Sequence, residues 1–291
     1  MLQIKCSAKI NLALSIVGKR PDGYHELDML MQSVSLYDYV ILQPSSQISI
    51  SCNFKYIPTD ERNIAYRAAQ VFFRALGSND GVDIALKKRI PSQAGLGGGS
   101  SDCAGVLLGL NHLYGKPFSM EQLKELGLTL GADVPFFFDG GCQRAQGVGE
   151  MLSPVPNRLK AHFLLVKPKK GVKTNEAFAL YAKMPHSAPP VIDQCILALS
   201  QGNLPAFCKA TGNSLLEPAM SLCSQIKPIL EDLKKAGALG AFMSGSGSTC
   251  FGVFAHGADC KQAYRHFLSR GDVMVYECRA LPQSLFLLPN Q

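Results

Sequence analysis

A glycine-rich run in the first half of the chain is the strongest sign of chemistry. Four glycines fall within residues 95–99, Ser100 and Ser101 follow directly, and a strand-like and a helix-like segment flank the run. Glycines let the backbone approach a ligand closely, and the free N–H groups of a following helix attract anions. The run fits neither the Walker pattern, since no lysine follows the glycines, nor the dinucleotide pattern G-x-G-x-x-G. It therefore predicts a phosphate site of another type, with a plain flexible turn as the alternative.

Two charged residues stand in otherwise apolar surroundings. Lys9 shares one face of a predicted strand with Asn11, and Asp133 is the only charge within residues 128–138. A buried carboxylate needs a partner, and Lys9 is the obvious candidate for a buried cation. Such a pair predicts a general base held beside a lysine. The alternatives are a lysine that reaches solvent and an aspartate that caps a helix or satisfies a backbone turn.

Two further segments predict ligand contacts. Tyr24 and His25 follow a turn and offer a ring for stacking and an imidazole for hydrogen bonding, unless the turn is only an exposed hairpin. A second glycine–serine cluster, at residues 243–249, is either a plain loop or a second backbone wall against the phosphates. The hydrolase pattern G-x-S-x-G does not fit this cluster, because Phe242 stands at the first glycine position.

Composition restricts the class of protein. The chain has 291 residues, of which 47% are apolar and 18% charged, with a formal net charge of +7. This predicts a globular protein that suits a small polyanionic ligand, and the lack of a basic stripe argues against nucleic acid. Ten cysteines without a C-x-x-C pair predict reduced thiols. The sequence shows neither a secretion signal nor a run of membrane-spanning length, so we expect a cytoplasmic protein without a membrane partner.

The scaffold that must position these residues mixes strands and helices, which predicts an α+β fold. Alternation and helical spacing predict, in the first half, strands at residues 4–8, 11–17, 34–42, 48–53 and 82–90 and helices at 63–76 and 103–113. Ser119 and Gln122 form a capping-box pattern for one more helix. Prolines interrupt residues 151–158, where we place a domain boundary. The second half is predicted to hold strands at 162–166, 249–254 and 273–278 and helices within 175–235 and at 258–268.

Together these segments resemble the GHMP kinase superfamily. The resemblance rests on an N-terminal lysine strand, a Tyr-His turn, the glycine–serine loop, the Asp133 segment and a Gly-Val-Gly-Glu turn, at residues 8–12, 23–25, 95–101, 128–135 and 147–150. The late glycine–serine cluster also has a counterpart in the family. Within the superfamily, the chain is most similar to kinases that act on a cytidine diphosphate-linked methylerythritol.

The resemblance implies two lobes with the active site in the cleft between them. The N-terminal lobe, residues 1–155, would resemble a ribosomal-protein-type domain, and the C-terminal lobe, residues 156–291, a ferredoxin-like domain. The implied reaction moves the γ-phosphoryl group of ATP to the C2 hydroxyl of the cytidylylated methylerythritol, in the non-mevalonate pathway of isoprenoid biosynthesis. Mg²⁺ is implied as the counter-ion of ATP, and we expect a monomer or a weak homodimer.

The same resemblance assigns roles to individual residues. Asp133 is the implied base and Lys9 its cationic partner, while Asn11, Tyr24 and His25 serve the substrate. The phosphates of ATP are assigned to the glycine run and its flank: Pro91, Ser92, Gln93, Ala94, Gly95, Leu96, Gly97, Gly98, Gly99, Ser100 and Ser101. Either of the two serines is a candidate for reaching the magnesium ion.

The sequence departs from the family on one side of the cytidine pocket. Where a second stacking aromatic is common, the chain has Met31 beside Gln32, so Phe178 or Tyr181 becomes the candidate for that role.

Other functions stay open on sequence alone. A kinase of the same family that acts on homoserine or a mevalonate-type alcohol is the nearest alternative. Tyr24 and His25 argue against it, because those acceptors have no base to stack. A catalytically silent nucleotide-binding protein on the same fold is a further alternative, although the chain keeps Lys9 and Asp133.

Overall fold

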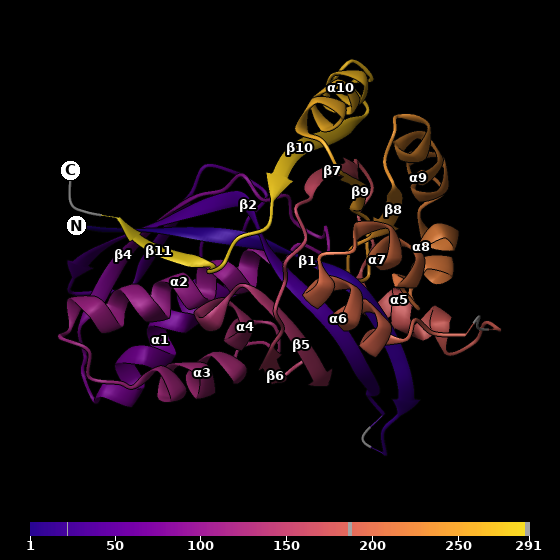
Figure 1. Ribbon diagram of the computed structural model, residues 1–291. Coiled ribbons are helices and arrows are strands. Elements are labelled where there is room, and N and C mark those ends of the chain that lie inside the picture. The colour runs from indigo at the N-terminus through magenta and orange to yellow at the C-terminus, as the bar shows by residue number, and fades with distance from the viewer. Residues whose placement is uncertain (22, 186–187, 289–291) are drawn as a thin grey trace.

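The computed structural model describes residues 1–21, 23–185 and 188–288, which form two lobes (Figure 1). The strands are β1 (Leu2–Lys19), β2 (His25–Ser45), β3 (Ser49–Cys52), β4 (Gly81–Lys87), β5 (Cys142–Gly147), β6 (Met151–Pro154), β7 (His162–Pro168), β8 (Gly240–Met243), β9 (Cys250–Phe254), β10 (Val273–Arg279) and β11 (Leu285–Leu288). The helices are α1 (Ile64–Leu76), α2 (Gly98–Leu113), α3 (Met120–Leu128), α4 (Val134–Asp139), α5 (Thr174–Tyr181), α6 (Ile192–Gln201), α7 (Leu204–Ala210), α8 (Leu216–Leu222), α9 (Ile226–Lys235) and α10 (Gly257–Leu268).

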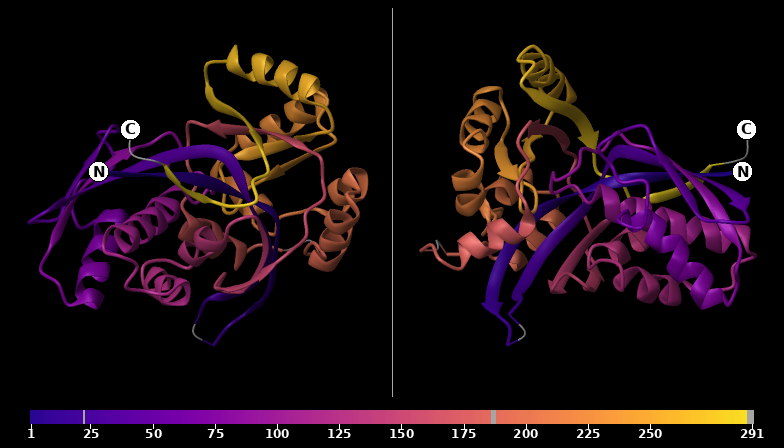
Figure 2. Two further views of the ribbon diagram at one scale, coloured as in Figure 1. Left: turned by 60° about the vertical axis from the view of Figure 1, so that its left-hand side comes forward. Right: turned by 180° about the vertical axis from the view of Figure 1, so that it is seen from behind.

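The first lobe is organised around a long hairpin formed by β1 and β2. Its strands follow the order β11-β1-β2-β4-β3, and β5, which carries β6 at its side, also pairs with β2. Helices α1 and α2 pack on this sheet, and α3 and α4 pack against α2 (Figure 2). Strand β11 pairs with β1, so the last strand of the described residues lies in the same sheet as the first (Figure 1). The division of the chain at residues 155 and 156 stays a prediction.

Strand β1 is longer than alternation predicts. The strands expected at residues 4–8 and 11–17 are parts of one strand, which pairs with β2 through register shifts next to Ser7 and Asn11. Residues 6–16 are buried without interruption. A strand buried on both faces loses the alternation of a half-buried strand. The predicted break was therefore wrong, because the second lobe covers the face of β1 that α2 leaves free.

The second lobe is built on a smaller sheet. Its strand order is β10-β7-β9-β8, and every pair is antiparallel. Helical segments follow β7 and β9 in the chain, which gives the ferredoxin-like arrangement of strands and crossovers. Helix α9 buries Ile226, Ile229, Leu230 and Leu233, the face that its spacing predicts. The α+β class and the two-lobed fold are thus confirmed.

Helix α2 begins inside the glycine run, at Gly98 rather than at residue 103. Its N-cap is Gly97, whose φ of 68° lies in the left-handed region that favours glycine. Residues 98–101 have no apolar side chains, so helical spacing could not reveal this first turn. The first N–H groups of α2 therefore belong to the run itself. The capping box of Ser119 and Gln122 is confirmed at the start of α3.

Helix α2 lies close to β1 because a glycine faces the strand. A Cβ atom on Gly105 would lie 2.4 Å from Sγ of Cys6, a side chain that is fully buried. Protein cores are packed densely enough that one extra methyl group is felt. The contact between Gly105 and Cys6 therefore helps to set the distance between β1 and α2, the helix in which the glycine run ends.

Replacing Gly105 with alanine tests this packing. Alanine favours a helix over glycine by about 1 kcal/mol, whereas overpacking a filled core costs about 1–3 kcal/mol. The two effects together should make Gly105→Ala lower the free energy of unfolding by up to about 2 kcal/mol in denaturant titrations followed by circular dichroism. The matched control on the same helix is Gly99→Ala, whose nearest neighbour would lie 3.6 Å away. Equal losses in both variants would contradict the packing argument.

Candidate functional site

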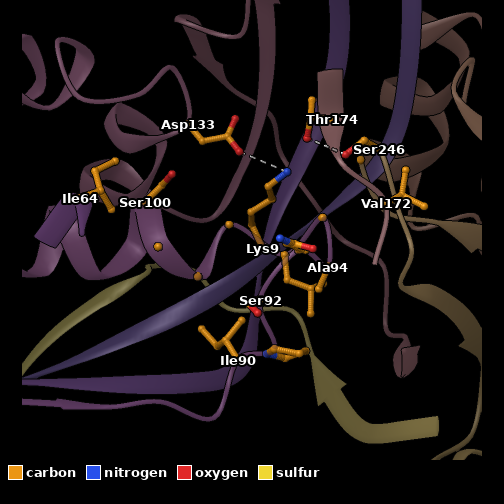
Figure 3. Close-up of a pocket in the computed structure, with 18 of the residues that line it drawn as sticks. Lys9, Ile64, Ile90, Ser92, Ala94, Ser100, Asp133, Val172, Thr174 and Ser246 are labelled. Atoms are coloured by element: carbon orange, nitrogen blue, oxygen red, sulfur yellow. Dashed lines mark hydrogen bonds and ion pairs between the residues drawn. The ribbon is translucent and has the colours of Figure 1, made fainter. Parts of the chain in front are cut away.

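A cavity of about 670 Å³ opens where the two lobes meet (Figure 3). Strand β1 and the glycine run form one side of it, and Asp133 lies at the start of α4. The second lobe contributes residues 245–247 and the start of α5. The cavity therefore collects segments that are far apart in the sequence.

Lys9 and Asp133 meet in this cavity. Nζ of Lys9 lies 3.5 Å from Oδ2 of Asp133 (Figure 3). The same ammonium donates a hydrogen bond of 2.6 Å to Oδ1 of Asn11. Lys9 is only 5% exposed, so its ammonium does not reach out to solvent. Asp133 caps none of the N–H groups of α4, a helix that lies wholly in the described part of the chain. A lysine that reaches solvent and an aspartate that caps a helix are therefore excluded.

The structure corrects one expectation about Asp133. The apolar run around it predicts a buried carboxylate, but its side chain is 36% exposed and lines the cavity. The apolar residues that follow it turn inward instead, since Val134, Pro135 and Phe136 are buried in α4. A carboxylate that is open to the cavity on one side and paired on the other is accessible to a ligand.

Asn11 joins β1 to the rest of the site. Its amide nitrogen donates a hydrogen bond to Sδ of Met29, and its backbone N–H donates to Oγ of Ser244 at 3.0 Å. That hydroxyl donates in turn to the carbonyl of Gly95 at 2.8 Å. One serine of the late cluster therefore holds both β1 and the glycine run.

The glycine run lies along the cavity as predicted. Of its eleven candidate residues, ten line the cavity, and the exception among these described residues is Ser101, whose side chain is fully buried. Gly95 has a φ of 72°, and a Cβ atom there would lie 2.1 Å from the carbonyl oxygen of Ser244. Only glycine fits this position, so the backbone of the run can lie directly against the second lobe.

The late glycine–serine cluster forms the opposing wall. Gly245, Ser246 and Gly247 line the cavity, and the hydroxyls of Ser246 and Thr174 lie 2.9 Å apart (Figure 3). Nδ2 of Asn213 supports the wall from behind by donating to the carbonyl of Gly245 at 2.8 Å. This placement agrees with a second backbone wall rather than with a plain loop.

An aromatic cluster lies beside the cavity. The ring of His25 stacks on Phe178 at 5.1 Å between centroids and meets the edge of Tyr181 at 5.8 Å. Phe178 also lines the cavity. Tyr24 is 67% exposed, and Met31 is fully buried in the sheet, so Met31 presents no surface to a ligand. The structure thus brings His25 to both aromatic residues that the sequence offers as alternatives to Met31.

Sequence reasoning missed a group of buried charges beneath the glycine run. Nζ of Lys88 donates to Oδ2 of Asp38 and, at 2.5 Å, to Oδ2 of Asp102. The three side chains are almost fully buried, and Lys88 and Asp102 border the cavity. The available signal was Asp38, a charge within a strand that is otherwise rich in apolar residues.

The three groups perturb one another's titration. Burial raises the pKa of the Asp102 carboxyl well above its usual range; the Lys88 ammonium opposes this shift, and Asp38 adds to it. Burial alone would lower the pKa of Lys88, but the two carboxylates outweigh it and raise that pKa above its ordinary value. The lysine therefore stays charged while it serves both carboxylates.

Comparisons of the whole chain agree with this architecture. Residues 63–141 match the GHMP kinases N terminal domain, and residues 195–272 match the GHMP kinases C terminal domain. A 4-diphosphocytidyl-2-C-methyl-D-erythritol kinase from Alkaliphilus metalliredigens is 41% identical over 271 residues, covering 91% of this chain and 92% of the relative. The enzyme of that name from Clostridium perfringens is 42% identical over 255 residues, covering 87% and 88%.

Solved structures show the same fold. A crystal structure of 4-(cytidine 5'-diphospho)-2C-methyl-D-erythritol kinase is similar with a TM-score of 0.79 and 35% identity, covering 95% of this chain and 98% of that one. Homoserine kinase from Cytophaga hutchinsonii also reaches a TM-score of 0.79, with 99% and 97% covered, but at 18% identity it supports the fold alone.

The described residues offer neither a cluster of metal ligands nor a membrane-spanning helix. No group of three or more histidine, cysteine, aspartate or glutamate side chains there is arranged to hold a metal ion. None of the helices in the same residues is both long enough and apolar enough to cross a membrane.

Gly95→Ala tests the close contact between the backbones of Gly95 and Ser244. A residue with a Cβ atom in the left-handed region costs about 1–2 kcal/mol, and the clash with a backbone carbonyl adds to this. We expect a nucleoside triphosphate analogue to bind at least about tenfold more weakly in calorimetric titrations. The control is Gly237→Ala, which has a φ of 93° but no neighbour within 4 Å of the new Cβ atom, and lies away from the cavity. Weaker binding in the control as well would contradict a local effect.

Proposed function

The chain belongs to the GHMP kinases, and we propose that it transfers the γ-phosphoryl group of ATP to the C2 hydroxyl of 4-diphosphocytidyl-2-C-methyl-D-erythritol. It is thus an ATP-dependent small-molecule kinase of the non-mevalonate pathway of isoprenoid biosynthesis. Relatives of that name are 41% and 42% identical over most of the chain. The observation that carries the chemistry is the ion pair of Lys9 and Asp133 in a cavity lined by a phosphate-type loop.

The ion pair supplies what a hydroxyl acceptor needs. The carboxylate of Asp133 accepts the proton of the C2 hydroxyl while the oxygen of that hydroxyl forms a bond to the γ-phosphorus. The bond from that phosphorus to the β–γ bridging oxygen breaks, and ADP leaves with the electron pair. The buried ammonium of Lys9 stabilises the negative charge that develops on the acceptor oxygen.

The glycine run supplies the site for the phosphates. The N–H groups at the start of α2 face the anion and need no lysine in the run itself. Mg²⁺ carried by ATP fits this site as a ligand-borne ion, because Mg²⁺ is commonly bound by substrate phosphates, water and few protein groups. Of the two candidate serines, Ser100 lines the cavity, and its hydroxyl would complete the coordination of the ion. The ion would neutralise phosphate charge.

The aromatic cluster is the proposed cytidine site. A cytosine ring stacks on an aromatic face, and an imidazole recognises its hydrogen-bonding edge. Phe178 and Tyr181 flank His25 for this purpose, with Tyr24 beside it in the chain. Asn11, which accepts a hydrogen bond from Lys9, lines the same cavity as Phe178. Homoserine and mevalonate have no base to occupy such a site.

Two further expectations concern the enzyme in the cell. We retain a cytoplasmic location and a monomeric or weakly dimeric state as predictions. All ten cysteines fall within the described residues and are unpaired there, in keeping with reduced thiols.

Variants of the ion pair test the chemistry. We expect Asp133→Asn and Lys9→Ala each to lower kcat by on the order of 100-fold or more, because the base or the stabilising charge is lost. ADP release in a coupled assay measures this. A matched pair lies at the other end of α4, where Lys124 and Asp139 approach to 2.7 Å. Lys124→Ala and Asp139→Asn should keep wild-type turnover, and wild-type turnover in either site variant would remove that residue from the mechanism.

A panel of acceptors tests the substrate assignment. The same assay compares the cytidylylated methylerythritol with methylerythritol phosphate, homoserine and mevalonate. Stacking of one base contributes about 1–3 kcal/mol, so acceptors without cytidine should show kcat/KM values lower by about 10- to 100-fold or more. Equal values with and without cytidine would defeat the assignment while leaving the kinase class intact.

A further inference from the structure

The buried charges beneath the glycine run connect both of its ends. Oδ1 of Asp38 accepts hydrogen bonds from the backbone N–H groups of Arg89, at 2.5 Å, and Ile90, at 2.8 Å. These are the last residues before Pro91, where the loop that carries the glycine run begins. On the far side, Asp102 follows Ser101 within α2, and Lys88 joins Asp102 to Asp38. The ammonium of Lys88 thus connects strand β2 to both ends of the loop, directly through Asp102 and indirectly through Asp38.

The start of α2 is pressed against this cluster. A Cβ atom on Gly98 would lie 2.8 Å from Cγ2 of Ile90 and 3.4 Å from Oδ2 of Asp38. The absence of a side chain at Gly98 therefore lets the first helical turn lie directly on the residues that Asp38 holds. A shift of the cluster would move the N–H groups that face the cavity.

The cluster is poorly arranged if stability is its only role. Two carboxylates share one lysine, and Oδ1 of Asp102 is buried with no hydrogen-bond partner among the described residues. Buried ion pairs are often no more stabilising than apolar side chains of the same volume, and a buried unpaired oxygen costs free energy. A charged network at this point is better explained by the geometry it imposes.

We propose that Asp38, Lys88 and Asp102 are positioning residues for ATP, which hold the glycine run in its phosphate-binding shape before the nucleotide arrives. The inference rests on the proposed ATP site and not on the identity of the acceptor. None of the three residues needs to touch the phosphates. They act because a loop whose two ends are already fixed loses less conformational entropy when it binds a ligand.

The test separates positioning from stability. It removes the hydrogen bonds that Lys88 makes to Asp38 and Asp102, and it leaves no unpaired lysine charge behind. In Lys88→Met/Asp102→Leu, one cation and one anion are removed together, and Asp38 keeps its two backbone donors. We expect KM for ATP, and Kd for a non-hydrolysable ATP analogue without acceptor, to rise by about tenfold or more. At saturating ATP, kcat should stay within about threefold of the wild type and KM for the acceptor should not change. The backbone amides of residues 92–98 should exchange hydrogen faster than in the wild type.

Two single variants complete the test. Asp102→Asn keeps an oxygen for Lys88 to bond, so it should retain ATP affinity close to the wild type and act as the conservative rescue. Asp28 lies on β2, as Asp38 does, and its carboxylate accepts hydrogen bonds from Arg144 at 2.6 and 2.8 Å, away from the loop. The variant Asp28→Asn loses this carboxylate and should also bind ATP normally.

A merely structural role predicts a different result. Lost stability lowers the amount of folded enzyme and thus apparent kcat, but it leaves KM for ATP unchanged. The proposal is overturned if the double variant has a lower melting temperature or kcat with wild-type affinity for ATP. Failure of the wild type itself to bind the analogue would instead refute the proposed ATP site, and with it this inference.

Discussion

The site depends on the burial of one cation. Lys9 lies on β1 where the strand is covered on both faces, so its ammonium must find oxygen partners within the protein. Asn11 and Asp133 supply these partners at 2.6 and 3.5 Å. Because Asp133 stands at the start of α4, which packs against α2, the position of this proposed base follows from the packed core of the first lobe. A base held in this way does not depend on a mobile loop for its geometry.

The second constraint is close approach between backbones at the junction of the lobes. Gly95 lets the glycine run meet the late cluster, and Gly97 leaves room for Phe137 and the stem of Lys9. Across this junction, the N–H group of Thr249 donates to the carbonyl of Ala94, and Ser244 bonds the run and β1 together. The lobes are thus joined at the site by backbone groups and one short side chain, whose positions vary less than those of long side chains.

Local signals explain which parts were predictable. The capping box of α3, the glycine run and the isolated charges of Lys9 and Asp133 can be recognised because each is unusual within a few residues. The single strand β1 could not be recognised, since its second covered face comes from a lobe that begins far along the chain. The same holds for His25 and Phe178, which meet only through the folding of both lobes. Asp38 was overlooked because its partners, Lys88 and Asp102, are distant in sequence from it.

The charges around the loop also bear on the proposed phosphate site, which has no lysine within the loop itself. Lys9 is paired with Asp133, and Lys88 is shared between two buried carboxylates. Neither ammonium is therefore a free counter-charge for a triphosphate. In the proposed function, attraction of the phosphates would then fall to the N–H groups at the start of α2 and to the metal ion carried by ATP. Such a loop binds through the placement of its backbone, so the residues that fix its ends matter as much as those that line it.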